Sequence, residues 1–220
     1  MRKHVILKLQ GPLQAWGGHS FEGLRPSEIF PGRSTLLGLL AACLGIDRAD
    51  QPNQQNLASS ILFAVRVDET QYKPIKITDY HTVKDARVDY KGLKSHETIQ
   101  TWREYWQDVS YTVAIWEQKN AVISLNELTN ALHKPIFTPF LGRRSCALAR
   151  PLFESMIEKE SALQALESIE PYIGTVYSEE GESNHMQLQK RDVPIVHQPR
   201  QFSTRRVYVQ QSRGGSHVPE

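Results

Sequence analysis

The 220-residue sequence predicts an α+β fold, and three observations support this class. Short runs rich in branched and aromatic residues predict strands, and one long apolar run predicts a buried helix. The order strand, helix, strands, helix, strand is that of a ferredoxin-like or RNA-recognition-type sheet. An apolar content of 40% is enough for a sizeable core.

The first predicted elements are a strand and a buried helix. Residues 5–11, VILKLQG, alternate in the manner of a strand. Residues 34–45 are apolar on all sides, so we expect a helix packed on a sheet, with Ser34 or Thr35 as N-cap. Gly45 is expected to end this helix because glycine adopts the left-handed conformation of a C-terminal cap.

The remaining elements are read from shorter patterns. In chain order we expect a polar connector over 47–56, strands over 61–67, 75–80 and 110–116, a helix over 125–132, a strand over 138–141, a helix over 161–169 and short strands over 186–190 and 207–210. The segment 81–108 is long for a connection in a compact domain, and such lengths are usually functional or disordered.

Composition limits the classes of function. The net charge is only +2, so nucleic-acid binding would depend on where the charges lie and not on the total. Cys43 and Cys146 are far apart and lack metal-ligand spacing, which favours a reduced, cytoplasmic protein. No run approaches the length of a membrane span, and the N-terminus is interpreted as a strand and not as a signal peptide.

Two arginine-bearing loops are candidate phosphate sites. Arg143 and Arg144 follow Gly142, which permits a turn, and guanidinium groups suit phosphate oxygens. The alternative is a surface loop whose arginines pair with carboxylates. Arg33 precedes the buried helix, and an anion could bind at the amides of that helix N-terminus; the alternative is an ordinary cap with a solvated arginine.

Catalytic and metal motifs are weak. The eight histidines have no metal-ligand spacing, so we expect neither a metal nor a cofactor. Ser145 lies in RSC and not in the G-x-S-x-G motif of hydrolases. His81 or His96, with Lys94 and a tyrosine, could cleave RNA by metal-independent acid–base catalysis, although these are common residues.

Seven motifs occur in order between about Val5 and Tyr208. They are GPLQAW, FPGRSTLLGLLAACLGI, DYHTV, GLKSHETIQTWREYW, TPFLGRRSC, VYSEE and PRQF. Together they resemble the CasD-type subunits, CRISPR-associated RAMP proteins, of the type I-E Cascade complex. Each motif is modest, but the ordered set is specific.

The resemblance implies a fold and an organisation. We expect an RNA-recognition-type palm over 1–150 with a protruding thumb hairpin inserted at about 81–108. A small β-rich C-terminal part is expected over 151–211 and a flexible tail over 212–220. Aromatic residues of the thumb could stack on bases. Trp102 and Tyr105 are three apart, however, so they could share one helical face, and burial is the expected role of these two.

The resemblance also implies partners in an antiviral complex in the cytoplasm. Such a subunit caps the backbone filament and holds the 5′ handle of the CRISPR RNA. It contacts the backbone subunit, the large PAM-sensing subunit and target DNA near the handle–spacer junction. The candidate RNA-binding residues, which lie in or near the motifs, are Gln14, Trp16, Arg33, Ser34, His81, Lys91, Lys94, His96, Arg143, Arg144, Ser145, Arg200 and Arg205.

Three functions are compatible with the sequence. The first is the non-catalytic RNA-binding subunit, because a separate Cascade subunit cuts the precursor RNA. The second is a metal-independent endoribonuclease, because a relative in another CRISPR subtype is itself the nuclease. The third is a protein–protein adaptor, which only the low net charge favours.

Overall fold

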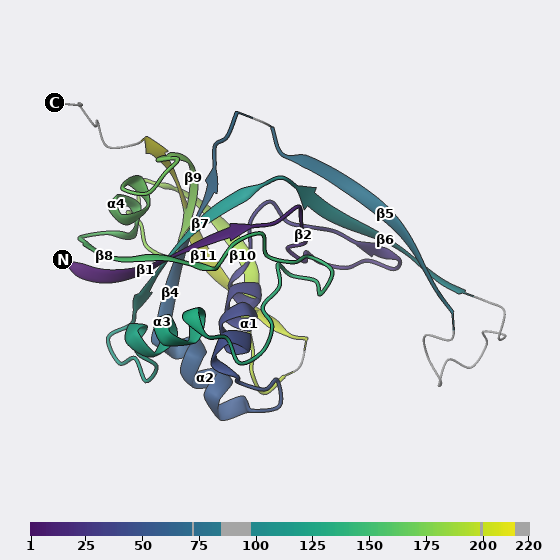
Figure 1. The fold of residues 1–220 in the computed structure, drawn as a ribbon, viewed down its shortest axis with the longest axis horizontal. Helices are drawn as coiled ribbons and strands as arrows, with labels where there is room; N and C mark the ends of the chain where they lie inside the picture. Colours follow the sequence, from purple (N-terminus) through teal and green to yellow (C-terminus); the bar gives the residue numbers. More distant parts are fainter. Residues whose placement is uncertain (72, 85–97, 199, 214–220) are drawn as a thin grey trace.

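The computed structural model describes residues 1–71, 73–84, 98–198 and 200–213 (Figure 1). In chain order its elements are β1 Arg2–Gln10, β2 Leu13–Gln14, β3 Leu24–Arg25, α1 Arg33–Leu44, α2 Gln51–Ser60, β4 Ile61–Asp68, β5 Ile75–Lys84, β6 Thr98–Gln107, β7 Ser110–Glu117, α3 Leu125–His133, β8 Phe153–Lys159, α4 Ala162–Glu167, β9 Ile173–Ser178, β10 Met186–Pro194 and β11 Phe202–Arg213. None of the described helices is long and apolar enough to cross a membrane.

The palm consists of β1, α1, β4, β7, α3 and β8. Its four strands lie side by side in the order β4-β7-β1-β8, and each neighbouring pair is antiparallel. Each helix therefore joins two strands that have a third strand between them, which is the ferredoxin-like arrangement. The predicted α+β class is confirmed.

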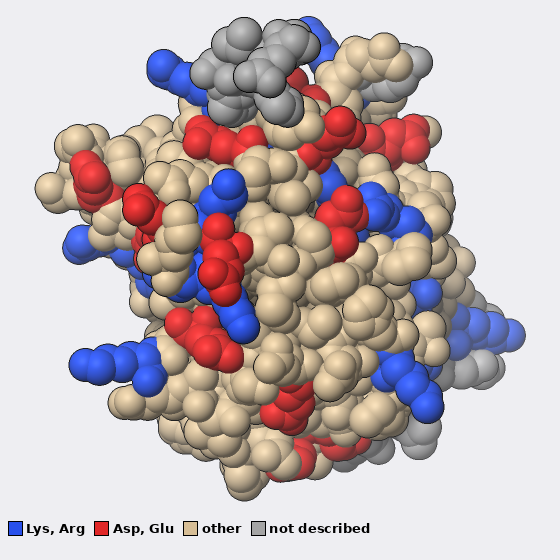
Figure 2. All heavy atoms as spheres, turned by 60° about the vertical axis from the view of Figure 1, so that its left-hand side comes forward, with Lys and Arg blue, Asp and Glu red and all other residues tan. Residues whose placement is uncertain are grey.

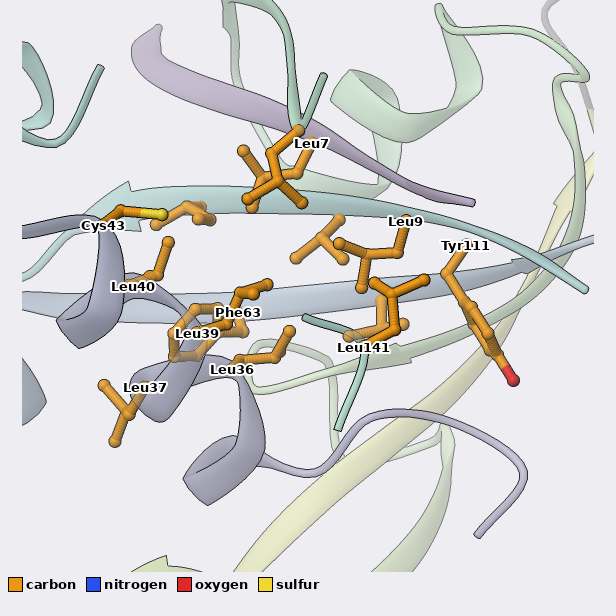
Figure 3. Close-up of a cluster of buried hydrophobic side chains, with 14 of the residues drawn as sticks. Leu7, Leu9, Leu36, Leu37, Leu39, Leu40, Cys43, Phe63, Tyr111 and Leu141 are labelled. Carbon is orange, nitrogen blue, oxygen red and sulfur yellow. The ribbon is translucent and has the colours of Figure 1, made fainter. Parts of the chain in front are cut away.

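The main core lies between the palm sheet and helices α1 and α3. Leu7 and Leu9 of β1 face Leu36 and Leu40 of α1, and all four side chains are at most 1% exposed (Figure 3). Burial of each such side chain contributes about 1.5–3 kcal/mol. A smaller cluster on the other face of the sheet packs against α4. The apolar run of α1 is thus explained by burial between the sheet and the other helices.

Polar groups are also buried on the α4 side of the sheet. Arg66 donates to Asp68 at 2.7 Å and to the carbonyl oxygen of Ile169, near the C-terminal end of α4, at 2.9 Å. Lys8 Nζ lies 3.2 Å from the same aspartate, and burial lowers the pKa of Lys8 although Asp68 opposes that shift. These cations neutralise the aspartate, and Arg66 also donates to carbonyl groups at and just after the C-terminal end of α4.

The C-terminal strands belong to the same sheet as the palm. β9 pairs with β4, β11 with β9 and β10 with β11, which gives a sheet of seven strands. β8, the fourth palm strand, begins at Phe153. The expected boundary at residue 150 therefore does not coincide with a break in the sheet. β11 continues to Arg213, so residues 212 and 213 are strand and not tail, and 214–220 lie outside the described residues.

Two predicted elements differ from the structure. Residues 138–141 are not a strand; the last palm strand comes after them. The polar segment 47–56, expected as a connector, contains most of α2. The Asp50 side chain caps α2 by accepting from the Asn53 amide, and Pro52 lies in the first turn. Because Leu57 is the only apolar side chain of α2 that is fully buried, the helix has no apolar periodicity to reveal it.

The N-cap of α1 also differs from the prediction. The cap is Gly32, and neither Ser34 nor Thr35 has this role. The carboxylate of Asp192 accepts from the Arg33 amide at 2.8 Å, so an acidic side chain from β10 occupies the helix N-terminus. The C-terminal end at Gly45, with a φ of 72°, is as predicted.

The thumb is a hairpin of β5 and β6 inserted between palm strands β4 and β7, and it projects away from the palm in Figure 1. β2 and β3 flank β6 and complete a second sheet. Its paired strands run from Ile75 to Gln107 and so begin before the expected start at residue 81. Residues 85–97, with Lys91, Lys94 and His96, lie outside the described residues.

Gly142 has a conformation that only glycine adopts easily. Its φ is +87°, and a Cβ atom built there would lie 1.8 Å from the Ala15 carbonyl oxygen. Gly38 in α1 provides a contrast, because it is exposed and a Cβ atom there would meet nothing within 4 Å.

We expect Gly142→Ala to lower the free energy of unfolding by at least about 2 kcal/mol, because both the positive φ and the close approach of Ala15 oppose a side chain. The matched control Gly38→Ala should raise it by roughly 0.5–1 kcal/mol, since alanine favours the helix interior. Urea unfolding followed by circular dichroism measures both. Equal stabilities for the two variants would contradict the strained turn.

Candidate nucleic-acid interface

The loop 142–145, which we call the arginine loop, lies at the base of the thumb. The backbone of Leu141 pairs with that of Cys146 at 2.8 Å, which closes the loop. The Leu141 carbonyl accepts from the Ala15 amide at 3.1 Å. These bonds bring the GPLQAW and LGRRSC motifs together although about 125 residues separate them.

Arg143 attaches the arginine loop to the thumb. Its two terminal nitrogens donate at 3.2 Å to the carbonyl oxygens of Glu104 and Arg25, and its guanidinium lies 4.5 Å from the ring centre of Tyr105. It pairs with backbone carbonyls and a ring instead of the carboxylates that the alternative interpretation required. Arg143 is therefore mainly a structural residue.

Arg144 and Ser145 are the exposed members of the arginine loop. Among the described residues, Arg144 has no hydrogen bond or ion pair, so its guanidinium is free to bind an external anion. Burial raises the pKa of the neighbouring Cys146 thiol, which keeps it neutral and unreactive. Of the residues in this motif, Arg144 has the geometry that phosphate binding requires.

Further arginines lie beside this loop. Arg25 of β3 is the register partner of Arg103 of β6, and both are half-buried. Because side chains alternate along a strand, Arg103 is on the same face of β6 as Tyr105 and thus on the side of Arg143. We call Arg25, Arg103, Arg143 and Arg144 the basic base of the thumb. The sequence prediction did not include Arg25 or Arg103 among the site residues, and the two-residue period of TWREYW could have revealed Arg103.

Glu104 is an acidic residue on the opposite face of β6 from Arg103, and it is neutralised. Its carboxylate accepts from the Ser27 amide at 3.0 Å and lies 2.9 Å from Lys76 Nζ. Burial pushes the pKa of Glu104 up, but these two hydrogen bonds outweigh it, so the pKa lies below its usual value. The carboxylate therefore adds little repulsion toward a phosphate.

Arg33 and Arg205 lie elsewhere and are used internally. Arg33 pairs with Glu179 at 2.6 Å, and its other terminal nitrogen donates to the carbonyl oxygens of Ala58 and Ile61. Arg205 bridges Glu179 and Asp192. Both arginines are buried or nearly so, and Asp192 occupies the helix N-terminus. The structure therefore argues against a phosphate at Arg33, because carboxylates of the chain itself fill that position.

Gln14 and Trp16 are structural. Gln14 is fully buried and its side-chain amide donates to the Val109 carbonyl oxygen. Trp16 is 1% exposed and packs edge-on against Tyr111. Neither side chain can reach RNA in this arrangement. Ser34 is half-buried in the first turn of α1, without a capping role.

Arg200 and His81 are on the surface but apart. Arg200 is exposed in the turn between β10 and β11, with a φ of 64°. His81 lies on β5 and hydrogen-bonds Asp79, two residues away. Within the described residues, no three histidine, cysteine or acidic side chains cluster in a way that could hold a metal ion. The described site residues thus gather in two places, around the arginine loop and around Glu179 and Asp192, and of these two places the arginine loop has the exposed arginine.

A space-filling view shows the side of the molecule that carries the N-terminus, β8 and α4 in Figure 1. Lysine, arginine and acidic side chains are interspersed there, with no large patch of one sign (Figure 2). This side therefore lacks the continuous basic surface that binding to a nucleic-acid backbone favours.

Comparisons with known proteins agree with the geometry. Residues 4–208 match the family described as CRISPR-associated protein (Cas_Cas5). The chain is 50% identical to the CRISPR system Cascade subunit CasD of Escherichia coli (strain K12), and the match covers both chains completely.

Two solved structures have the same fold. A chain of a CRISPR RNA-guided surveillance complex matches with a TM-score of 0.71 and 26% identity, over 95% of this chain and 90% of the other. A crystal structure of a Cas protein matches with a TM-score of 0.61 and 25% identity, over 94% and 93% of the two chains. The resemblance that the seven motifs indicate is confirmed, and the chain belongs to the Cas_Cas5 family of CRISPR-associated proteins.

Proposed function

We propose that the chain is a non-catalytic RNA-binding subunit of a CRISPR surveillance complex, Cascade, in which it holds the 5′ handle of the CRISPR RNA and caps the backbone filament. The observation that carries this proposal is the basic base of the thumb on a chain of this family, with Arg144 exposed and unpaired among the described residues. The identity to the E. coli Cascade subunit supports it.

The proposed partners follow from the same relatives. They are the CRISPR RNA, the backbone subunit, the large PAM-sensing subunit and target DNA near the handle–spacer junction, and the proposed location is the cytoplasm. The structural match to a chain of an RNA-guided surveillance complex supports assembly with RNA and other subunits. The palm supplies a rigid support, and the thumb projects from it to where a neighbouring subunit can reach.

A metal-independent endoribonuclease is the second candidate. It has one observation in its favour, the pairing of His81 with Asp79, which could orient an imidazole for proton transfer. His81 lies on a thumb strand, whereas Lys94 and His96 lie outside the described residues. The non-catalytic role is the better-supported proposal because the identity to the E. coli Cascade subunit and the exposed Arg144 both favour it.

We expect Arg144→Ala to weaken binding of a repeat-derived handle RNA and to lower the log–log salt slope by about 0.7 for each phosphate that Arg144 neutralises. Its fold should be unchanged because Arg144 is exposed. Arg48→Ala, which removes another exposed arginine in the loop before α2, is the matched control and should leave affinity and slope unchanged. The affinity of each variant for the handle RNA, measured over a range of salt concentrations, tests both expectations.

Arg143→Ala belongs in the same series because its effect separates structure from binding. It should lower the thermal midpoint as well as the affinity, since it removes the hydrogen bonds to Glu104 and Arg25. An unchanged salt slope in folded Arg144→Ala protein would count against phosphate binding at the arginine loop.

The isolated chain should not cut a repeat-containing precursor RNA, with or without EDTA, and His81→Ala should leave processing by the complete complex intact. The reason is that the proposal assigns cutting to another subunit. Gel analysis of end-labelled precursor RNA measures both. Specific cleavage by the isolated chain that His81→Ala or His96→Ala abolishes would favour the endoribonuclease instead.

A further inference from the structure

One face of the thumb sheet carries two exposed aromatic side chains. Tyr80 is 52% exposed and Trp102 is 44% exposed. The two residues are register partners on β5 and β6, with ring centres 5.5 Å apart and ring planes tilted by 50°. Single exposed apolar side chains are common on protein surfaces, whereas adjacent ones often mark a binding site. The pair of neighbouring exposed rings therefore indicates a surface that binds a ligand or a partner.

The strand geometry of β5 and β6 separates the exposed aromatic side chains from the packed ones. Tyr105 is 4% exposed and lies on the opposite face, beneath Arg143. Trp106 is half-buried; its Nε1 donates to the Glu28 carbonyl oxygen at 2.6 Å, and Lys76 Nζ lies 4.9 Å from its ring centre. Tyr80 and Trp102 are thus the two aromatic rings on the described part of the thumb that remain largely open.

Apart from Trp106 and Leu24, the 42% exposed register partner of Trp102 on β3, the residues around this pair are mostly polar or basic. By strand alternation, the described neighbours on the same face are Lys76, Thr78, Thr82 and Lys84 of β5 and Thr98, Gln100, Glu104 and Trp106 of β6. The single carboxylate among them, Glu104, is bonded by Lys76 and Ser27. The core of a protein–protein interface is more apolar than this. Aromatic rings among hydroxyls, amides and lysines are typical of surfaces that bind single-stranded nucleic acid.

We infer that Tyr80 and Trp102 form a stacking platform for one unpaired nucleobase, with Lys84 positioned at the end of the same face for a neighbouring phosphate. This inference rests on the proposed function and deepens it. Because the platform and Arg143 lie on opposite faces of the thumb sheet, the nucleotide on the platform is a different one from that bound by Arg144. The thumb therefore separates two nucleotides of one bound strand.

The test uses the full chain and a short single-stranded RNA of mixed sequence. Trp102→Leu should weaken binding roughly 5- to 100-fold, because it removes one stacking surface, and should leave the salt slope unchanged. Trp102→Phe keeps a π-face and should bind within about threefold of the unchanged chain. Phe137→Leu, which changes another exposed aromatic side chain outside the thumb, is the matched control and should have no effect.

Two further probes define the ligand. A single-stranded DNA of the same sequence should show the same weakening with Trp102→Leu, because every base has a π-face, whereas duplex RNA should compete poorly since its bases are already stacked. If the single-stranded DNA bound but Trp102→Leu left its affinity unchanged, stacking on the Trp102 ring would not be what holds the base, and the inference would be overturned.

The outcomes separate this inference from the proposed function. If Arg144→Ala lowers the salt slope but Trp102→Leu leaves affinity unchanged, only the platform is wrong. If Trp102→Leu binds RNA normally but fails to assemble with the other subunits, the occupant of this face is a protein and the inference is overturned. If the unchanged chain binds no single-stranded RNA, both proposals fall.

Discussion

The close approach of the Gly142 backbone to the Ala15 carbonyl joins three parts of the molecule. Ala15 follows β2, which pairs with the thumb strand β6, and the arginine loop follows directly from Gly142. A side chain at this position would push the loop away from the thumb and would move Arg143 from the carbonyl groups it bonds. The basic base of the thumb therefore depends on this backbone contact as well as on the hydrogen bonds of Arg143.

Several arginines of the chain stabilise the fold and are not available to bind RNA. Arg33 and Arg205 neutralise Glu179 and Asp192, and Arg66 neutralises Asp68. Buried carboxylates of this kind need such partners, because an unpaired buried charge costs several kcal/mol. Motifs rich in arginine are thus a poor measure of nucleic-acid binding capacity, and exposure distinguishes Arg144 from these residues.

The sequence predicts the local features of the fold well, because they depend on neighbouring residues. The first strand, the buried helix with its end at Gly45 and the turn at Gly142 all follow from short patterns. The contacts of Arg33 could not be predicted in this way, since Asp192 is 159 residues away in the chain. The interpretation of Trp102 and Tyr105 as one helical face was wrong because the segment is a strand, which places them on opposite faces.

The two ends of the thumb insertion meet in the palm. Ser110, at the start of β7, donates a hydrogen bond to Asp68, at the end of β4, with 2.9 Å between the oxygens. A hairpin connection between these strands would thus be short, and the free energy cost of closing a longer one grows only slowly with length. Beyond the pairs that β6 makes with β2 and β3, the thumb can accordingly change in length during evolution while the register of the palm strands stays the same.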